Sequence, residues 1–389
     1  MRTRNAFGQL LIATLLWLLA TAAGAAPRIA VMTMQPGEIF FERFGHNAIV
    51  VDDPEVGAPI SYNFGFFDLG EPGFLGRFIH GDMQYKLVAL PVMDDLVYYR
   101  DVGRGVSIQW LDLPPEQAQA IADALAFNAR PENARYRYDY FTDNCSTRVR
   151  DALDRGLGGA LRKQLEVRSA GDTFRSEAVR LASPAWWMWL GFDIGLGPFA
   201  DRPLSRWEDA FVPMRLAASL RETKNTEGRP LVQKESELLP HRLPPDPPDT
   251  PRRWWPWLIA GLALAFAMRG LSTHKPRVFG AIALPGWSLL GVLGCVLAFL
   301  WLATTHRAGW ANHNLLLFSP LCLLLVPGAW TLLRGRAVSP FHRGVRIAVG
   351  VGAIAALFLQ LLPGAQFQAP WLALLVPVHL ALAFPARRA

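Results

Sequence analysis

The pattern of apolar and polar positions divides the chain near residue 253. Beyond that point apolar residues run in five stretches, at about 254–271, 281–304, 314–333, 345–362 and 370–385. A helix needs ~20 apolar residues to cross a bilayer. The stretches therefore predict a helical transmembrane domain over residues 254–389 with about five spans. The last stretch is short and contains Pro377, so a re-entrant segment is an alternative there.

Residues 27–222 have shorter apolar runs and predict a folded domain outside the membrane. β-branched runs at Arg28–Thr33 and Asn47–Val51 are typical of strands. A third strand is expected near Ile60–Phe67, after a turn at Pro54 and Gly57, and Val106–Leu111 is another strand candidate. Prolines at 114 and 115 open a predicted helix that ends near Asn128, and a second helix is expected from Cys145 to about Leu157. The pattern thus predicts a domain that mixes strands and helices.

Residues 223–253 are polar and rich in proline. Six prolines follow one another closely, at positions 240, 244, 245, 247, 248 and 251. Proline lacks the backbone N–H that helices and sheet interiors require. This region therefore predicts a stiff, extended linker between the two domains.

The first 26 residues have the pattern of an export signal. Arg2 and Arg4 precede an apolar stretch over Leu10–Leu19, and small residues over Ala22–Ala26 offer a cleavage site. An uncleaved membrane anchor is the alternative. Under either interpretation, the domain that follows lies outside the cytoplasm.

Positive charges flank the apolar stretches unevenly. They gather after the first stretch, around the third and at the C-terminus, as Arg269, His274, Lys275, Arg277, Arg334, Arg336, Arg343, Arg346, Arg387 and Arg388. The loops at 305–313 and 363–369 together contain one arginine, Arg307, and no lysine. Because positive loops remain in the cytoplasm, the C-terminus is predicted to be cytoplasmic and residues 27–222 to lie on the opposite side.

Composition narrows the function classes. Hydrophobic residues make up 51% of the chain, charged residues 18%, and the formal net charge is +7. No basic stripe with interleaved aromatics appears, so the positive balance indicates membrane orientation, and nucleic acid is not an expected partner. No His-Glu-x-x-His, paired Cys-x-x-Cys or glycine-rich phosphate loop is present, so neither a metal nor a cofactor is predicted.

Cys145 is the single cysteine of the predicted exported domain, since Cys295 and Cys322 lie in apolar stretches. It has no disulfide partner in its own domain despite an oxidising compartment. It also follows Asp143 and Asn144, both plausible helix caps, at the first turn of a helix. Free N–H groups there lower a thiol pKa and can donate to an oxyanion. Cys145 is thus a candidate nucleophile; a small buried apolar residue is the alternative.

A cysteine nucleophile needs a base within hydrogen-bonding reach. His46 and His80 lie in the exported domain, and His241 lies in the linker. His46 begins a predicted strand directly after Gly45, which favours it as the base. Spacing alone leaves the choice open.

Several motifs together resemble a known family. They are Gly45–Ala48, Tyr62–Asp68, Asn128–Asn133 and Tyr138–Asp151, followed by Leu196-Gly197, Asp201–Pro203, Phe211–Pro213 and Trp310–Leu316. They resemble the Lnb family of bacterial lipoprotein N-acyltransferases. The resemblance implies an α+β periplasmic domain with a circularly permuted, NlpC-like papain fold, in which the histidine strand precedes the cysteine helix.

The resemblance also implies an activity and a location. The Cys145 thiolate would take an acyl chain from a membrane phospholipid, and the α-amine of a diacylglyceryl-cysteine lipoprotein would accept it, with His46 as base. The bilayer, the phospholipid donor and the lipoprotein acceptor are then the expected partners. The protein would be a multi-pass protein of the bacterial inner membrane with a periplasmic N-terminal domain.

Other residues are weaker candidates for the site. Asn63 is expected to orient His46, with Asp68 as the alternative. Arg148 is expected to face a phosphate or to pair with Asp151 or Asp154. Further along the chain, Trp310, Asn312 and His313 are expected to complete the substrate site; interfacial anchoring would also explain the tryptophan.

Two other functions remain open. A papain-like cysteine hydrolase would cleave peptidoglycan peptides or phospholipids. A non-enzymatic envelope scaffold would use the membrane helices to assemble partners and would not need Cys145.

Overall fold

The computed structural model describes residues 26–167, 171–250 and 252–384. Within these residues the chain forms two compact units. The first comprises residues 26–68, 84–167 and 205–244, and the second comprises residues 69–83, 171–204, 245–250 and 252–384. The predicted export signal over 1–26, except for its last residue, lies outside the described residues.

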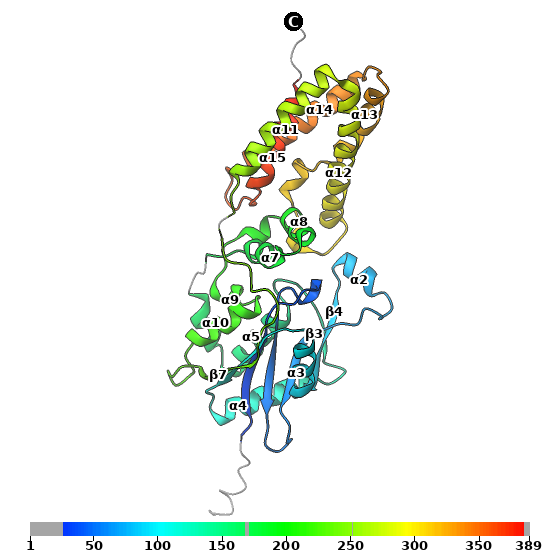
Figure 1. Cartoon of the computed structure of the whole chain (residues 1–389). Helices are drawn as coiled ribbons and strands as arrows, with labels where there is room; N and C mark the ends of the chain where they lie inside the picture. The colour runs from blue at the N-terminus through cyan, green and yellow to red at the C-terminus, as the bar shows by residue number, and fades with distance from the viewer. Residues whose placement is uncertain (1–25, 168–170, 251, 385–389) are drawn as a thin grey trace, which may run out of the picture. The chain divides into compact units, whose positions relative to one another are not determined.

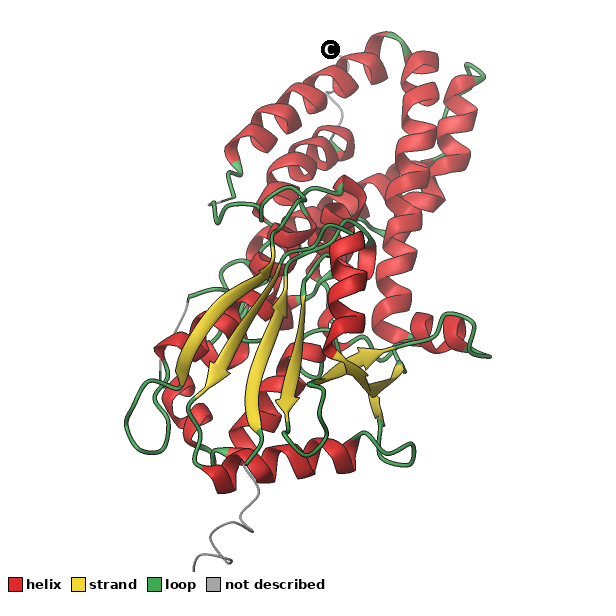
Figure 2. Ribbon diagram, turned by 60° about the horizontal axis from the view of Figure 1, so that its bottom comes forward, coloured by secondary structure: helices red, strands yellow, loops and turns green. Residues whose placement is uncertain are grey.

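A seven-stranded antiparallel sheet forms the centre of the first unit (Figure 2). Its strand order is β6-β4-β3-β2-β1-β5-β7. The strands are β1 (Arg28–Met34), β2 (His46–Asp52), β3 (Ile60–Phe66), β4 (Gln84–Pro91), β5 (Val106–Leu111), β6 (Arg135–Arg137) and β7 (Val232–Leu239). The structure confirms the four predicted strands as β1, β2, β3 and β5, and it adds three.

Helices cover the sheet because its central strands are apolar on both faces. Ala30, Met32 and Met34 of β1 share a core with Tyr99 of α3 (Val92–Asp101). The intervening residues of β1, such as Ile29 and Val31, are also fully buried and point to the opposite face. Other helices also contact strands of the sheet: α4 (Pro115–Asn128), α5 (Cys145–Gly156) and α10 (Pro213–Glu222). α6 (Ala160–Glu166) packs against α5 and against α9 (Arg206–Asp209). η1 (Phe40–Glu42) lies between β1 and β2 in the sequence.

The expectation of a linker over 223–253 needs correction. Residues 232–239 form β7, which pairs with β5 and makes one edge of the sheet. Most of the β7 side chains are exposed, which explains why its sequence is polar and why it was missed. Residues 240–250 keep the expected irregular backbone, and residues 223–231 form turns and bridges before β7.

The second unit also takes segments that were expected in the exported domain. They are α2 (Phe74–His80), α7 (Phe174–Ala182), α8 (Trp186–Gly195) and η2 (Pro198–Asp201). Thr305 N–H donates to the His80 carbonyl at 2.8 Å, which joins α2 to the loop after α12. The compact units therefore do not follow the predicted boundary at residue 222.

The remaining helices of the second unit come from the apolar half of the chain (Figure 1). α11 (Trp255–His274), α12 (Pro276–Leu302) and α14 (Pro340–Leu359) are long and apolar enough to cross a membrane. A bent pair, Arg307–Leu316 and Pro320–Leu333, with a 41° angle, is a broken span or a re-entrant loop. It contains η3 (Arg307–Gly309), η4 (His313–Leu316), η5 (Pro320–Leu325) and α13 (Val326–Leu333).

The count of candidate spans among the described residues is thus three or four, where about five were expected. Pro320 interrupts the third apolar stretch, because its ring cannot continue the preceding helix. The fifth stretch forms α15 (Ala369–Ala383), which is shorter than the ~20 residues of a full span. Within the unit α15 packs against α11 and α14.

Candidate active site

Cys145 is the first residue of α5, as predicted. Asn144 caps the helix: its Oδ1 accepts from the backbone N–H groups of Ser146 and Thr147, both at 2.9 Å. In return, Thr147 Oγ1 accepts from the Asn144 N–H at 2.7 Å. This capping box fixes where the helix begins and therefore fixes the position of the thiol.

His46 lies next to Cys145 and is supported by the neighbouring strand. It opens β2 on the same face as Ala48, which is directly opposite Asn63 of β3. His46 Nε2 lies 2.9 Å from Asn63 Oδ1. The remaining imidazole nitrogen, Nδ1, is then available to the Cys145 thiol, with which His46 makes a side-chain hydrogen bond.

Asp95 of α3 decides how the Asn63 amide is turned. Asn63 Nδ2 donates to Asp95 Oδ2 at 2.9 Å, and the Ser61 hydroxyl donates to the same oxygen. Because a carboxylate only accepts, the amide must present its NH₂ to Asp95 and its oxygen to His46. His46 therefore carries its proton on Nε2, and Nδ1 is left as the basic atom.

Ionisation of the Cys145–His46 pair is favoured despite burial. Burial opposes the thiolate, but the charge and hydrogen bond of His46 and the N–H groups of Asn47 and Ser146 together lower the pKa of Cys145. Burial likewise opposes the imidazolium, but the nearby Cys145 thiolate and the hydrogen bonds to Cys145 and Asn63 raise the pKa of His46. The two groups stabilise each other as a thiolate and an imidazolium.

A second polar chain lies beside the pair. Asn47 is fully buried, and its Nδ2 donates to Thr33 Oγ1 at 2.8 Å. Ser146 Oγ lies 2.8 Å from Asn47 Oδ1 and 2.7 Å from the Ala210 carbonyl oxygen. These contacts tie the residue after His46 to the residue after Cys145, so β2 and α5 keep a fixed relative position.

Arg148 pairs with Asp143 and not with the expected Asp151 or Asp154. Its NH2 donates to Asp143 Oδ2 at 2.6 Å. The guanidinium lies over the Tyr136 ring, 4.1 Å from its centroid. Arg148 thus braces an aromatic residue beside the site.

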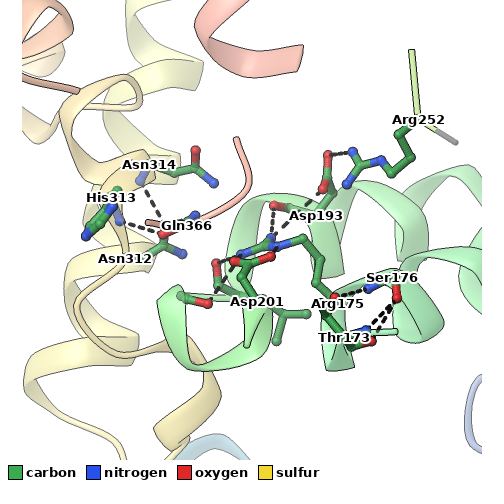
Figure 3. A network of polar contacts seen from close by, with 12 residues as sticks. Thr173, Arg175, Ser176, Asp193, Asp201, Arg252, Asn312, His313, Asn314 and Gln366 are labelled. Carbon is green, nitrogen blue, oxygen red and sulfur yellow. Dashed lines mark hydrogen bonds and ion pairs between the residues drawn. The ribbon is translucent and has the colours of Figure 1, made fainter. Parts of the chain in front are cut away.

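Trp310, Asn312 and His313 belong to the second unit, where they hold a loop together. Figure 3 shows Asn312 and His313 beside Gln366. Asn312 Nδ2 donates to the carbonyls of Ile194 and Gly195 at the C-terminal end of α8, at 2.8 and 2.9 Å. Asn312 Oδ1 accepts from Gln366 Nε2 at 3.0 Å, and Gln366 Oε1 accepts from the His313 N–H at 2.8 Å.

Trp310 Nε1 donates to the Thr304 carbonyl at 3.1 Å, within the same loop. These bonds give the Trp310–His313 segment a structural explanation. Its part in substrate binding stays a prediction.

Sequence reasoning proposed Asn63 and missed Asp95. A signal for Asp95 exists in α3, where Val92, Leu96 and Tyr99 repeat at helical spacing and pack against the sheet. Asp95 shares that face and is buried, so a carboxylate on an apolar helix face is the clue. The alternative residue Asp68 follows the end of β3 and is exposed.

One acidic group among the described residues has a spacing that suits a metal ion. Ligand atoms of Asp172, Glu177 and Asp249 lie within 4.8 Å of one another. Glu177 already pairs with Arg180, at 2.7 Å. All of these residues belong to the second unit, whereas Cys145 belongs to the first.

The fold and the site define an α+β domain with a Cys–His–Asn group, joined in one chain to apolar helices of membrane-spanning length. The chain belongs to the Lnb family: residues 13–182 match the Lnb N-terminal periplasmic domain, and residues 250–385 match the Lnb transmembrane domain. Neither the comparison with curated proteins nor that with solved structures gives a match.

Family membership indicates a lipoprotein-modifying protein of the inner membrane with a periplasmic N-terminal domain. The relation of this domain to the NlpC-like papain fold stays a prediction.

Proposed function

We propose that the protein is an N-acyltransferase that moves an acyl chain from a membrane phospholipid to lipoproteins through a thioester on Cys145. The observation that carries the proposal is the mutually stabilised Cys145–His46 pair at the first turn of α5. A thiolate is the reactive form of cysteine, and a nearby base keeps it ionised. The Lnb family match supplies the class of substrate.

In the first step, His46 holds the thiol proton on Nδ1, and the Cys145 sulfur attacks the carbonyl carbon of a phospholipid ester. The carbonyl oxygen takes the negative charge. When the carbonyl reforms, the C–O bond to glycerol breaks, and the leaving oxygen takes the proton from His46. A lysophospholipid departs, and Cys145 keeps the acyl chain as a thioester.

In the second step, the α-amine of an N-terminal diacylglyceryl-cysteine attacks the thioester carbon. His46, now neutral, takes a proton from the amine, and the C–S bond breaks. The product is an amide, and Cys145 returns as a thiolate. Asn63 keeps the imidazole turned correctly through both steps, because its Oδ1 accepts from His46 Nε2.

The direct test is the intact mass of a reporter lipoprotein from cells that lack their own N-acylation. The native chain is expected to add the mass of one acyl chain, and Cys145→Ala to add none. No mass gain from a well-expressed native chain would refute the N-acyltransferase proposal.

The same experiment separates the two alternatives. Cys145 as a residue is intermediate in exposure although its thiol is largely desolvated, and this residual contact with solvent is the observation in favour of a hydrolase. Cys145-dependent release of free fatty acid without N-acylation would establish the hydrolase. If the native and Cys145→Ala chains restored a strain that lacks this protein equally well, the non-enzymatic scaffold function would be established.

A further inference from the structure

Tyr136 of β6 carries a buried hydroxyl that has no use in the fold. Its side chain is only 9% exposed, and its Oη has no hydrogen-bond partner among the described residues. A buried polar group without a partner costs about 1–3 kcal/mol. Such a group in a folded protein therefore requires an explanation.

The hydroxyl lies beside the candidate nucleophile. A Cβ placed on Gly65 would lie 3.5 Å from Cys145 Cβ, 3.7 Å from the Tyr138 ring and 3.8 Å from Tyr136 Oη. Gly65 has φ +96 and lies where the β3–β4 register shifts, between Asn63 and Phe66. Because Gly65 has no side chain, space is left between the hydroxyl and the cysteine.

The second donor is the backbone N–H of Cys145 itself, at the start of α5. Of the first amides of α5, those of Ser146 and Thr147 donate to Asn144 Oδ1. No acceptor for the Cys145 N–H is found among the described residues. An N–H at the first turn of a helix is well suited to a developing negative charge.

We propose that the Tyr136 hydroxyl and the Cys145 N–H form the oxyanion site of the acyl transfer, with Gly65 leaving room for the substrate oxygen. The inference rests on the proposed function, because it concerns the same nucleophile. As sulfur attacks, the carbonyl oxygen gains a negative charge and accepts both hydrogen bonds. No proton moves from Tyr136, and the bonds weaken again when the carbonyl reforms.

The surroundings keep Tyr136 in place and protonated. Arg148 covers one face of its ring, and the Phe64 ring meets it edge-on with centroids 6.2 Å apart. Burial, followed by the nearby Cys145, raises the pKa of Tyr136 well above its ordinary value, although Arg148 opposes this. The phenol is therefore a neutral donor at physiological pH.

The test compares two reactions of Cys145 in the full-length protein carrying Tyr136→Phe. Acylation of the reporter lipoprotein is expected to fall by about 10²–10³-fold, the loss typical of one oxyanion donor. Alkylation of Cys145 by iodoacetamide forms no oxyanion, so its rate is expected to be unchanged. Tyr62→Phe is the matched control, because Tyr62 lies on the same sheet near Asp53, with its side chain on the face of β3 opposite to that of Asn63.

Each outcome decides the inference. Native acylation by Tyr136→Phe would refute it, and equal losses of acylation and alkylation would show a structural role instead. If the native chain does not acylate the lipoprotein, the proposed function fails on its own. Cys145-dependent cleavage of a p-nitrophenyl ester then replaces it as the assay, and an unchanged rate in Tyr136→Phe would refute the oxyanion site.

Discussion

Two buried polar clusters, one in each unit, differ in what their hydrogen bonds are used for. The cluster around Arg175 in the second unit joins α7, α8 and η2 (Figure 3). The cluster around Cys145 in the first unit joins β2, β3, α3 and α5. Both contain charged or ionisable groups, and both lie in well-packed surroundings.

Arg175 uses its whole guanidinium on the fold. Its Nε and NH2 donate to Asp201, at 2.8 and 2.9 Å, and NH1 and NH2 donate to the carbonyls of Asp193 and Leu196, both at 2.7 Å. Asp193 in turn accepts from Arg252 and from Trp371 Nε1, at 2.5 and 2.9 Å. All three guanidinium nitrogens of Arg175 are thus bonded to groups of the same unit.

The Cys145 cluster is arranged the other way. Every supporting residue is bonded, from Asn144 to Asp95. Two groups beside Cys145, its own N–H and the Tyr136 hydroxyl, have no hydrogen-bond partner within the part of the chain that the structure describes. Buried polarity alone therefore does not mark an active site. A more informative sign of an active site is a reactive atom that is positioned by fully hydrogen-bonded residues and lies beside polar groups without hydrogen-bond partners.

The largest expected effect removes the base. His46→Ala is expected to lower lipoprotein acylation by about 10⁴-fold, the upper range for a general base, with an unchanged melting temperature. The rate of mass gain in the reporter lipoprotein measures it. His80→Ala, which changes an exposed histidine, is the control and should acylate normally. A loss below tenfold for His46→Ala would show that another group serves as base.

The opposite pattern is expected from the second cluster. Arg175→Met leaves the buried Asp201 without its ion-pair partner and the carbonyls of Asp193 and Leu196 without their donor, and it should lower the free energy of unfolding by about 3–5 kcal/mol. Unfolding in detergent measures it. The control Arg162→Met removes an exposed ion pair with Glu166 and should not change the unfolding midpoint. An unchanged midpoint in Arg175→Met would contradict the structural role given to this cluster.

A smaller effect is expected from Asp95→Asn. The new amide can donate as well as accept, so Asn63 is no longer forced to turn its oxygen toward His46. A loss of about 1–3 kcal/mol in transition-state stabilisation, roughly 5- to 150-fold in rate, should follow without a matching loss of stability. Ser61→Ala, which keeps the carboxylate, should cost less. A fall in melting temperature that accounts for the lost rate would assign Asp95 to the fold alone.

The smallest and most specific effect concerns pH. Because His46 lowers the pKa of Cys145, iodoacetamide should alkylate the native thiol with a midpoint below that of an ordinary cysteine. In His46→Ala the effect of burial, which raises the pKa of Cys145, is no longer opposed by His46, so the midpoint of alkylation should move to higher pH. Rates of mass gain across a pH series measure both midpoints. Equal midpoints in the two proteins would contradict the thiolate–imidazolium pair.

β1, β2, β3 and β5 were predicted from the sequence because their β-branched or aromatic residues form apolar runs or alternate with polar residues. The edge strands β6 and β7 were not predicted, because Arg135 and Arg137 in β6 and Lys234 and Glu235 in β7 give them the composition of a surface segment. An edge strand is half solvated, so its sequence shows little of its pairing. Whether such a segment forms a strand depends on its pairing with a strand far away in the sequence, and the local residue pattern carries no information on that pairing.

The candidate site divides in the same way. Cys145 was found because a lone thiol after a capping residue is a local signal, and Asn63 because it lies on the strand after His46. Asp95 and Tyr136 reach the site only through the packing of α3 and the pairing of β6 with β4. The roles proposed for all four residues await the experiments above.

The two borders of the sheet bear on how the protein behaves among its own copies. β6 is three residues long and carries Arg135 and Arg137, both exposed, and β7 presents Lys234, Glu235 and Glu237 to solvent. Short or charged outer strands resist annealing with a strand from another molecule. Proteins held in a membrane meet one another often, so these two borders protect the exported sheet from polymerising along its hydrogen-bonding direction.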